Sequence, residues 1–139
     1  MQNARYLCSA IALKTTSLCA IPFQSLEQLS LKIPQLSHQL FRIMSKKIAS
    51  DKAFLTLITK KKADVLLATL LVNLSTRLKQ RNFSETEFFL RLTRKDIGSY
   101  LGLTIETVSR LFSRFRDEGL IETECQYVRL LNLTQLKKL

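Results

Sequence analysis

Apolar and polar residues recur along this chain with a period that changes from one segment to the next. Between Pro34 and Lys60 apolar positions return every three or four residues, which predicts one long helix with proline in its first turn. The preceding stretch QSLEQLSLKIPQL reads as a short helix that ends before Pro34, because the residue before a proline disfavours helical geometry. Helical spacing over residues 61–82 predicts a further helix.

Residues 6–23 show a different pattern, with two short extended-looking pieces, YLCSAIAL and SLCAIPF, on either side of the polar KTTS. This pattern predicts a two-stranded hairpin that ends at Pro22. Two strands alone are marginally stable in water, so we expect them to be part of a larger sheet whose other strands are missing. No apolar run approaches the roughly 20 residues of a membrane-spanning helix, so we expect no membrane partner.

Local signals around Thr93 predict a pair of helices. Thr93 can cap a helix over 94–101, with Asp96 three positions later in a box-like arrangement. Gly102 follows, where a residue in the left-handed conformation would close that helix, and Thr104 can cap the next one. A short helix, a tight glycine turn and a second helix together form a helix-turn-helix.

The second helix separates its side chains into two faces. Five apolar residues at helical spacing are expected to face inward: Ile105, Val108, Leu111, Phe112 and Phe115. The opposite face carries Glu106, Ser109, Arg110, Ser113 and Asp117, with Arg114 near its edge. In a DNA major groove, arginine can bond guanine in a fork, a carboxylate can accept from cytosine, and serine can serve several bases.

Glu106 helps to distinguish base reading from general attraction to DNA. Phosphate repels a carboxylate, so an acid flanked by cations favours contact with base edges. The alternative is a solvated amphipathic helix, which the capped helix and the glycine turn make the weaker interpretation.

Extended segments flank the helix pair. EFFLRLT, which ends at Thr93, offers Phe89 and Leu90 for packing. After Gly119, LIETECQYVRLL alternates enough for two strands around the polar TECQ, and a hairpin beside a helix-turn-helix is a wing. Cys125 would lie at its tip, as an incidental thiol or, alternatively, a redox group. NLTQLKKL reads as a short helix or a tail.

The long helix also carries the repeat of a coiled coil. Six positions alternate at steps of three and four: Phe41, Met44, Ile48, Asp51, Leu55 and Ile58. The helix could pack on its own domain or form a parallel dimer interface, and we favour the dimer because a twofold reader of DNA needs one. Two facing copies of Asp51 would destabilise this seam, so we expect Asp51 to keep the dimer weak unless another part of the molecule reinforces it.

The net charge of the chain restricts the kinds of partner that it can be expected to bind. A net charge of +11 and a pI near 10.0 favour a polyanion, either nucleic acid or an anionic membrane surface, over an inert basic surface. Cys8, Cys19 and Cys125 are far apart and His38 is the one histidine, so neither a metal site nor histidine-based catalysis is indicated. The cysteine pattern favours reduced thiols in the cytoplasm. No nucleophile–base pair or phosphate-cradling glycine loop indicates an enzyme.

The segment LTRKDIGSYLGLTIETVSRLFSRFRDEGLIE resembles the winged-helix DNA-binding domain of the CRP/FNR transcription regulators. It most resembles the fumarate and nitrate reduction branch, whose recognition helix has glutamate, serine and arginine where this chain has Glu106, Ser109 and Arg110. The resemblance extends upstream to LCAIPFQSLEQLS and covers most of residues 6–139. It implies a homodimer that reads an inverted repeat with TTGAT-like half-sites, and RNA polymerase as a candidate partner. Candidates for phosphate contacts are Thr93, Arg94, Thr107, Ser113 and Arg114.

The chain departs from the family pattern near its N-terminus. Family members have a sensory β-roll before the long helix, and we expect only its last two strands here. The branch holds an oxygen-sensitive 4Fe–4S cluster with four cysteines; Cys19 in LCAIPF matches one ligand and the other three have no counterpart. We therefore expect neither a cluster nor a cyclic-nucleotide pocket in this chain. We expect part of a longer regulator, with a short regulator that binds DNA without sensing as the alternative.

The expected fold is mainly α with small β elements. Residues 1–33 would hold the β-roll remnant and short helix, 34–60 the dimerisation helix, and 61–139 a winged-helix DNA-binding domain. The helix-turn-helix would occupy about 93–116 and the wing about 120–131. A different function for the same chain is an interaction module that forms heterodimers with full-length relatives.

Overall fold

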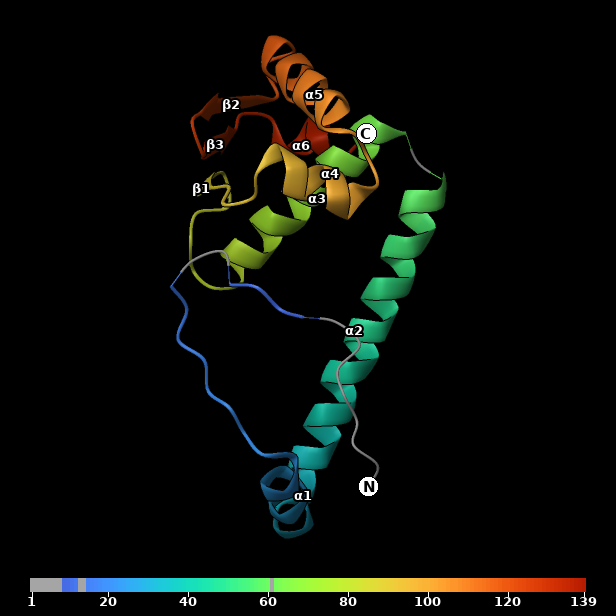
Figure 1. The fold of residues 1–139 in the computed structure, drawn as a ribbon, viewed down its shortest axis with the longest axis vertical. Helices are drawn as coiled ribbons and strands as arrows, with labels where there is room; N and C mark the ends of the chain where they lie inside the picture. Colours follow the sequence, from blue (N-terminus) through green and yellow to red (C-terminus); the bar gives the residue numbers. More distant parts are fainter. Residues whose placement is uncertain (1–8, 13–14, 61) are drawn as a thin grey trace. The chain divides into compact units, whose positions relative to one another are not determined.

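The computed structural model describes residues 9–12, 15–60 and 62–139, and the side chains of 57, 58 and 60 are not among the described ones. Within these residues the chain forms helices and a small sheet (Figure 1). The elements are α1 (Phe23–Lys32), α2 (Pro34–Lys60), α3 (Ala63–Lys79), β1 (Glu87–Phe89), α4 (Arg94–Leu101), α5 (Ile105–Asp117), β2 (Ile121–Glu124), β3 (Tyr127–Leu130) and α6 (Leu133–Leu136). The chain divides into two compact units, residues 1–46 and residues 47–139.

In the first unit, the two helices predicted around Pro34 are confirmed. α1 ends at Lys32, and the backbone N–H of Ile33 still donates to the carbonyl oxygen of Leu29 at 2.8 Å. α2 then begins at Pro34, whose fixed backbone angle suits a first helical turn.

The hairpin predicted for residues 6–23 is wrong in the part of the segment that the structure describes. Residues 9–12 and 15–22 contain no strand. Ile11 and Leu18 are 85% and 88% exposed, so these apolar side chains bury little surface. Extended backbone becomes a strand only when a neighbouring strand accepts and donates its hydrogen bonds, and sequence pattern alone does not supply that neighbour. The remaining residues of the predicted hairpin lie outside the described residues.

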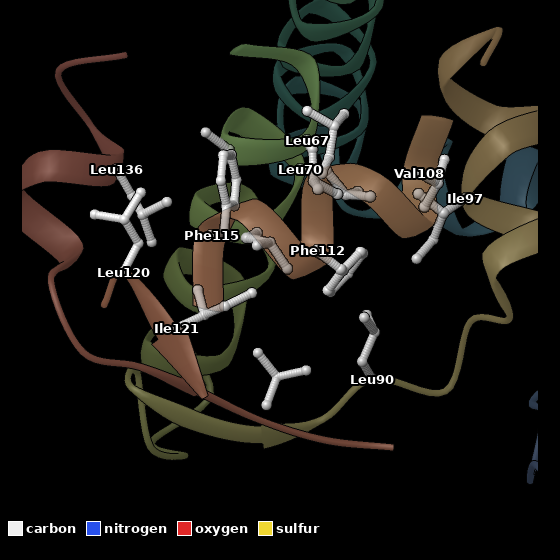
Figure 2. Close-up of a cluster of buried hydrophobic side chains, with 14 of the residues drawn as sticks. Leu67, Leu70, Leu90, Ile97, Val108, Phe112, Phe115, Leu120, Ile121 and Leu136 are labelled. Atoms are coloured by element: carbon white, nitrogen blue, oxygen red, sulfur yellow. The ribbon is translucent and has the colours of Figure 1, made fainter. Parts of the chain in front are cut away.

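The second unit is built around one hydrophobic core. Figure 2 shows side chains from α3, α4, α5, β2 and α6 in this cluster. Helical spacing explains why α3 and α5 supply most of it, because residues three or four apart share one face. The most deeply buried large side chains include Phe115, Leu67, Leu71, Ile97, Leu101, Leu120 and Ile121.

A three-stranded antiparallel sheet in the order β1-β3-β2 lies beside these helices. The predicted wing hairpin is confirmed, with β2 and β3 paired from Ile121 opposite Leu130 to Glu124 opposite Tyr127. β1 adds a strand on the other side of β3, with Phe88 opposite Val128. The extended segment is shorter than predicted, and its alternation buries Phe88 and leaves Phe89 60% exposed. Both residues offered for packing do pack, Leu90 within the core and Phe89 on the surface against Tyr127, with ring centroids 5.4 Å apart.

α2 contributes to both units. The aromatic ring of Phe54 on α2 packs against the core of the second unit. It stacks on the ring of Tyr100 of α4, with ring centroids 4.6 Å apart. Four residues of the predicted seam, Phe41, Met44, Ile48 and Leu55, are 57% to 67% exposed. Asp51 forms an ion pair with Lys47 at 2.6 Å, and the side chain of Ile58 lies outside the described residues. The role of the seam stays a prediction.

Candidate nucleic-acid interface

Side-chain caps hold both helices of the helix-turn-helix, as the sequence predicted. The hydroxyl of Thr93 accepts from the backbone N–H of Asp96 at 3.1 Å, and the Asp96 carboxylate accepts from the Thr93 backbone at 2.9 Å. The Thr93 hydroxyl also donates to that carboxylate, and together these bonds lower the pKa of Asp96. At the second helix the Thr104 hydroxyl accepts from the backbone N–H of Thr107 at 3.2 Å. Each cap satisfies a backbone donor that the helix itself leaves without a partner.

Two glycines set the turn between α4 and α5. Gly102 adopts the predicted left-handed conformation, with φ of 69°, which glycine tolerates without steric cost. Gly98 has a role that the sequence did not reveal. A Cβ atom on Gly98 would lie 2.6 Å from the carbonyl oxygen of Leu103, so the turn backbone approaches α4 more closely than any other residue would allow.

α5 presents a buried and an exposed face. Val108, Leu111, Phe112 and Phe115 are buried, as predicted. Ile105 was wrongly expected to face inward, because its side chain is 46% exposed. It is the first residue of α5, and the next core residue on this helix is Val108.

The three predicted base readers, Glu106, Ser109 and Arg110, are all exposed on α5. The pKa of Glu106 is lowered first by its own backbone N–H, then by the Thr104 hydroxyl, with a contribution from Arg110. Glu106 is therefore ionised at neutral pH and can only accept hydrogen bonds. Arg110 donates to the Thr107 hydroxyl across 3.4 Å, a long bond that leaves most of the guanidinium donors available.

Among the five phosphate candidates, the two arginines have partners within the protein. The guanidinium of Arg94 lies over the ring of Phe112, 3.3 Å from its centroid, and its pKa is lowered first by burial and then by Arg116. Arg114 forms ion pairs with Asp64 of α3 at 3.0 Å and with Glu118 at 3.1 Å. A phosphate would have to compete with these contacts.

The hydroxyl candidates are also engaged. Thr93 and Thr107 take part in the caps of the two helices. Ser113 accepts a hydrogen bond from Arg116 at 3.1 Å. All five phosphate assignments stay predictions, and the long-range contacts of the two arginines could not be read from their positions in the sequence.

The turn at the tip of the wing contains Cys125, as predicted from the sequence. Cys125 is exposed in the turn between β2 and β3 and has a positive φ of 51°. On the sheet, Arg129 donates to Glu87 at 2.8 Å and to Glu122 at 3.3 Å, and the Tyr127 hydroxyl donates to Glu87 at 2.6 Å. These bonds lower the pKa of Glu87, with the Tyr127 hydrogen bond as the largest cause. They connect all three strands through side chains.

The described residues do not assemble the thiolate set of a 4Fe–4S cluster. Cys19 is exposed, Cys8 lies outside the described residues, and no group of three or more potential metal ligands occurs in the described part. Among the described helices, none has both the length and the apolar character needed to cross a membrane.

Comparison with known proteins supports the assignment of the helix-turn-helix. The model of the Crp-like helix-turn-helix domain matches residues 67–139, which is more than half of the chain. The chain belongs to this family. The match includes most of α3, both helices of the helix-turn-helix and all three strands.

Curated relatives from this family are named as regulators. The chain is 49% identical over 132 residues to the transcriptional activator protein FnrA of Stutzerimonas stutzeri, covering 95% of this chain and 54% of that protein. It is 48% identical to the transcriptional activator protein Anr of Pseudomonas aeruginosa, covering 98% of this chain and 56% of that protein. For the fumarate and nitrate reduction regulatory protein of Escherichia coli the identity is 45%, covering 94% and 52%. The chain thus spans about half the length of the curated relatives that it matches.

Solved structures of other proteins share the fold. FixK2 from Bradyrhizobium japonicum matches with a TM-score of 0.73 and 28% identity, covering 84% of this chain and 57% of that one. A CooA variant from Carboxydothermus hydrogenoformans matches with a TM-score of 0.69 and 22% identity, covering 84% and 54%, which supports the fold alone.

Proposed function

We propose that this chain is a sequence-specific DNA-binding transcription regulator that reads an inverted repeat with TTGAT-like half-sites as a homodimer in the cytoplasm. The observation that carries the proposal is the exposed face of α5, where Glu106, Ser109 and Arg110 are available on a helix fixed by caps and core packing. The family match to the helix-turn-helix domain and the names of the curated activators support it. We propose RNA polymerase as a partner by the same analogy.

Each of the three residues has a chemical role in the major groove. Arg110 would donate two hydrogen bonds to O6 and N7 of a guanine, and Glu106 would accept from the amino group of a cytosine on the opposite strand. Ser109 would bond a neighbouring base pair. The ionised state of Glu106 fits this role, because a protonated carboxyl would offer a donor where cytosine also offers one.

Homodimerisation would bring two such helices to successive major grooves about one turn of DNA apart. The exposed seam on α2 supports this arrangement, since Phe41, Met44 and Ile48 form an apolar stripe for which a second copy is the natural complement. The same stripe also favours the second candidate function, in which the chain forms heterodimers with longer relatives without binding DNA itself.

Selection of bound sites from random DNA tests the proposal. The wild type should enrich an inverted repeat, and Arg110→Ala should lose preference at a single position of each half-site at a cost of about 1–3 kcal/mol. Arg81→Ala is the matched control, because Arg81 is an exposed arginine outside the helix-turn-helix. An unchanged selection profile for Arg110→Ala would remove the base-reading role of Arg110. No enrichment by the wild type, combined with loss of a relative's DNA binding on mixing, would favour the heterodimer function.

A further inference from the structure

An ion pair connects the recognition helix to the first turn of α3. Nη2 of Arg114 on α5 lies 3.0 Å from Oδ2 of Asp64, a residue 50 positions away in the sequence. The side chain of Asp64 is only 21% exposed. Its other carboxylate oxygen, Oδ1, accepts from the backbone N–H of Val65 at 2.8 Å. Asp64 is therefore bonded to both helices at once.

Arg114 is held on its other side as well. Its Nε lies 3.1 Å from Oε1 of Glu118, one turn further along α5. The neighbouring residue on α5, Phe115, is fully buried in the core. The guanidinium is thus held between the carboxylate of Glu118 on its own helix and the carboxylate of Asp64 on α3, next to the buried Phe115.

The local charge does not favour a phosphate at this position. Two carboxylates surround one guanidinium, so the group carries a net negative charge when all three side chains are ionised. The hydrogen bond from Arg114 is the largest cause that lowers the pKa of Asp64, which keeps that carboxylate ionised at neutral pH. For Arg110, in contrast, the hydrogen bond to Thr107 is long, at 3.4 Å, and among the described residues no carboxylate lies within ion-pair distance, although Arg110 helps to lower the pKa of Glu106.

We propose that Asp64 and Arg114 form a positioning pair that fixes α5 against α3, and that Arg114 supports base reading through this pair rather than through a phosphate contact. The inference rests on the proposed function. Base edges donate and accept hydrogen bonds only within a narrow range of positions, of the order of 0.5 Å and 10–20°. A rotation of α5 about its buried side would move Arg110 and Glu106 away from their bases while leaving the core intact.

α3 follows directly after α2, which carries the predicted dimer seam, so the pair also has a place in the dimer. Asp64 is the second residue of α3. In a homodimer, the angle between each recognition helix and the seam helix sets the spacing of the two half-sites. The pair fixes α5 to the end of α3 that is nearest in sequence to the seam helix.

A double-mutant cycle tests the pair with the full chain. Asp64→Asn, Arg114→Gln and the double variant are compared with the wild type for the dissociation constants of an inverted-repeat duplex and a scrambled duplex, over a series of salt concentrations. Each single variant should lower the ratio of specific to non-specific affinity roughly 3–10-fold, and the double variant should be no worse than either, because coupled residues are not additive. The dependence of non-specific affinity on salt should stay that of the wild type for Arg114→Gln.

A phosphate contact gives the opposite pattern. Arg114→Gln would then weaken both duplexes equally and reduce the salt slope by about 0.9 for each protomer, or about 1.8 for the dimer. Asp64→Asn would bind both duplexes as tightly as the wild type or more tightly, because it removes a negative charge. This result would overturn the positioning role. Glu27→Gln is the control for loss of a carboxylate elsewhere, since Glu27 lies on α1.

Two further readings separate the possible failures. Thermal unfolding shows whether each variant is folded. If Arg114→Gln does not fold, Arg114→Lys replaces it, because lysine keeps the positive charge and can donate one hydrogen bond to Asp64. Arg114→Lys should retain part of the ratio of specific to non-specific affinity. A wild type with no preference for the inverted repeat would overturn the proposed function and this inference with it. A selective wild type with independent, additive effects of the two substitutions would overturn this inference alone.

Discussion

The close approach at Gly98 yields the sharpest prediction about the helix-turn-helix. A Cβ atom at this position would lie 2.6 Å from the carbonyl oxygen of Leu103, and the backbone N–H of Leu103 already donates to the carbonyl of Gly98 at 2.9 Å. The obstacle is backbone, so no side-chain rotation can relieve it. In Gly98→Ala the turn has to move by roughly 0.8 Å to reach the 3.4 Å at which ordinary contact begins.

Two opposing effects set the magnitude. Overpacking costs about 1–3 kcal/mol in a well-packed region, and alanine in place of glycine recovers about 1 kcal/mol of helix propensity. The middle of the overpacking range leaves a net loss of about 1 kcal/mol in the free energy of unfolding of Gly98→Ala, and its upper end leaves about 2 kcal/mol. A loss of about 1 kcal/mol corresponds to a fall in Tm of roughly 4–8 °C for a unit of this size. Selectivity for the inverted repeat should fall further than stability does, because the displaced turn carries α5 with it.

Thermal unfolding at fixed protein concentration and competition between specific and scrambled duplexes measure both effects. Gly102→Ala is the matched control, because a Cβ atom there meets nothing within 4 Å and only the positive φ of 69° is strained. That strain should cost about 1 kcal/mol with little change in selectivity. A Gly98→Ala variant that melts at or above the wild type, or that loses no more selectivity than Gly102→Ala, would refute the reasoning.

Two more predictions follow from the seam and from the first cap. Asp51→Ala should lower the dissociation constant of the dimer in sedimentation equilibrium, because two facing carboxylates leave the seam, and equal constants for variant and wild type would contradict this. The cap should lose its contribution in acid. The pKa of Asp96 is lowered from its ordinary 3.8, so its stabilisation is fully present above that value and is lost as the pH falls through the lowered pKa. Urea unfolding of Asp96→Asn between about pH 5 and pH 2 should therefore show a smaller loss of stability than the wild type, and equal losses would argue against the cap.

The helix-turn-helix could be predicted from the sequence because its signals are local. Thr93, Gly102 and Thr104 act on backbone groups within a few residues, so their positions alone define where each helix begins and ends. The outer face of α5 followed from helical spacing for the same reason. Ile105 was misplaced because periodicity assigns a side to a residue but does not show whether the core extends that far.

Features that depend on distant segments could not be predicted. β1 is three residues long and is defined by its pairing with β3, some forty positions later. The partner of Arg114 is Asp64, and the close neighbour of Gly98 is a carbonyl oxygen across the turn. The N-terminal hairpin failed in the opposite way, since an extended pattern was present and no strand formed in the described part of it.

The pairing of β1 with β3 has a consequence for how this reading unit can be divided. β1 precedes the helix-turn-helix and β3 follows it, so the ladder from Glu87 to Arg129 closes a loop that contains both helices. A fragment that ends at Gly119 would lack Val128, which pairs with Phe88, and Gln126, whose carbonyl oxygen accepts from the backbone N–H of Leu90 at 2.7 Å. We therefore expect the two helices and the wing to fold and unfold as one module together with α3, whose Leu67 and Leu71 lie in the same core, with tolerated exchange points before α3 rather than between α5 and β2.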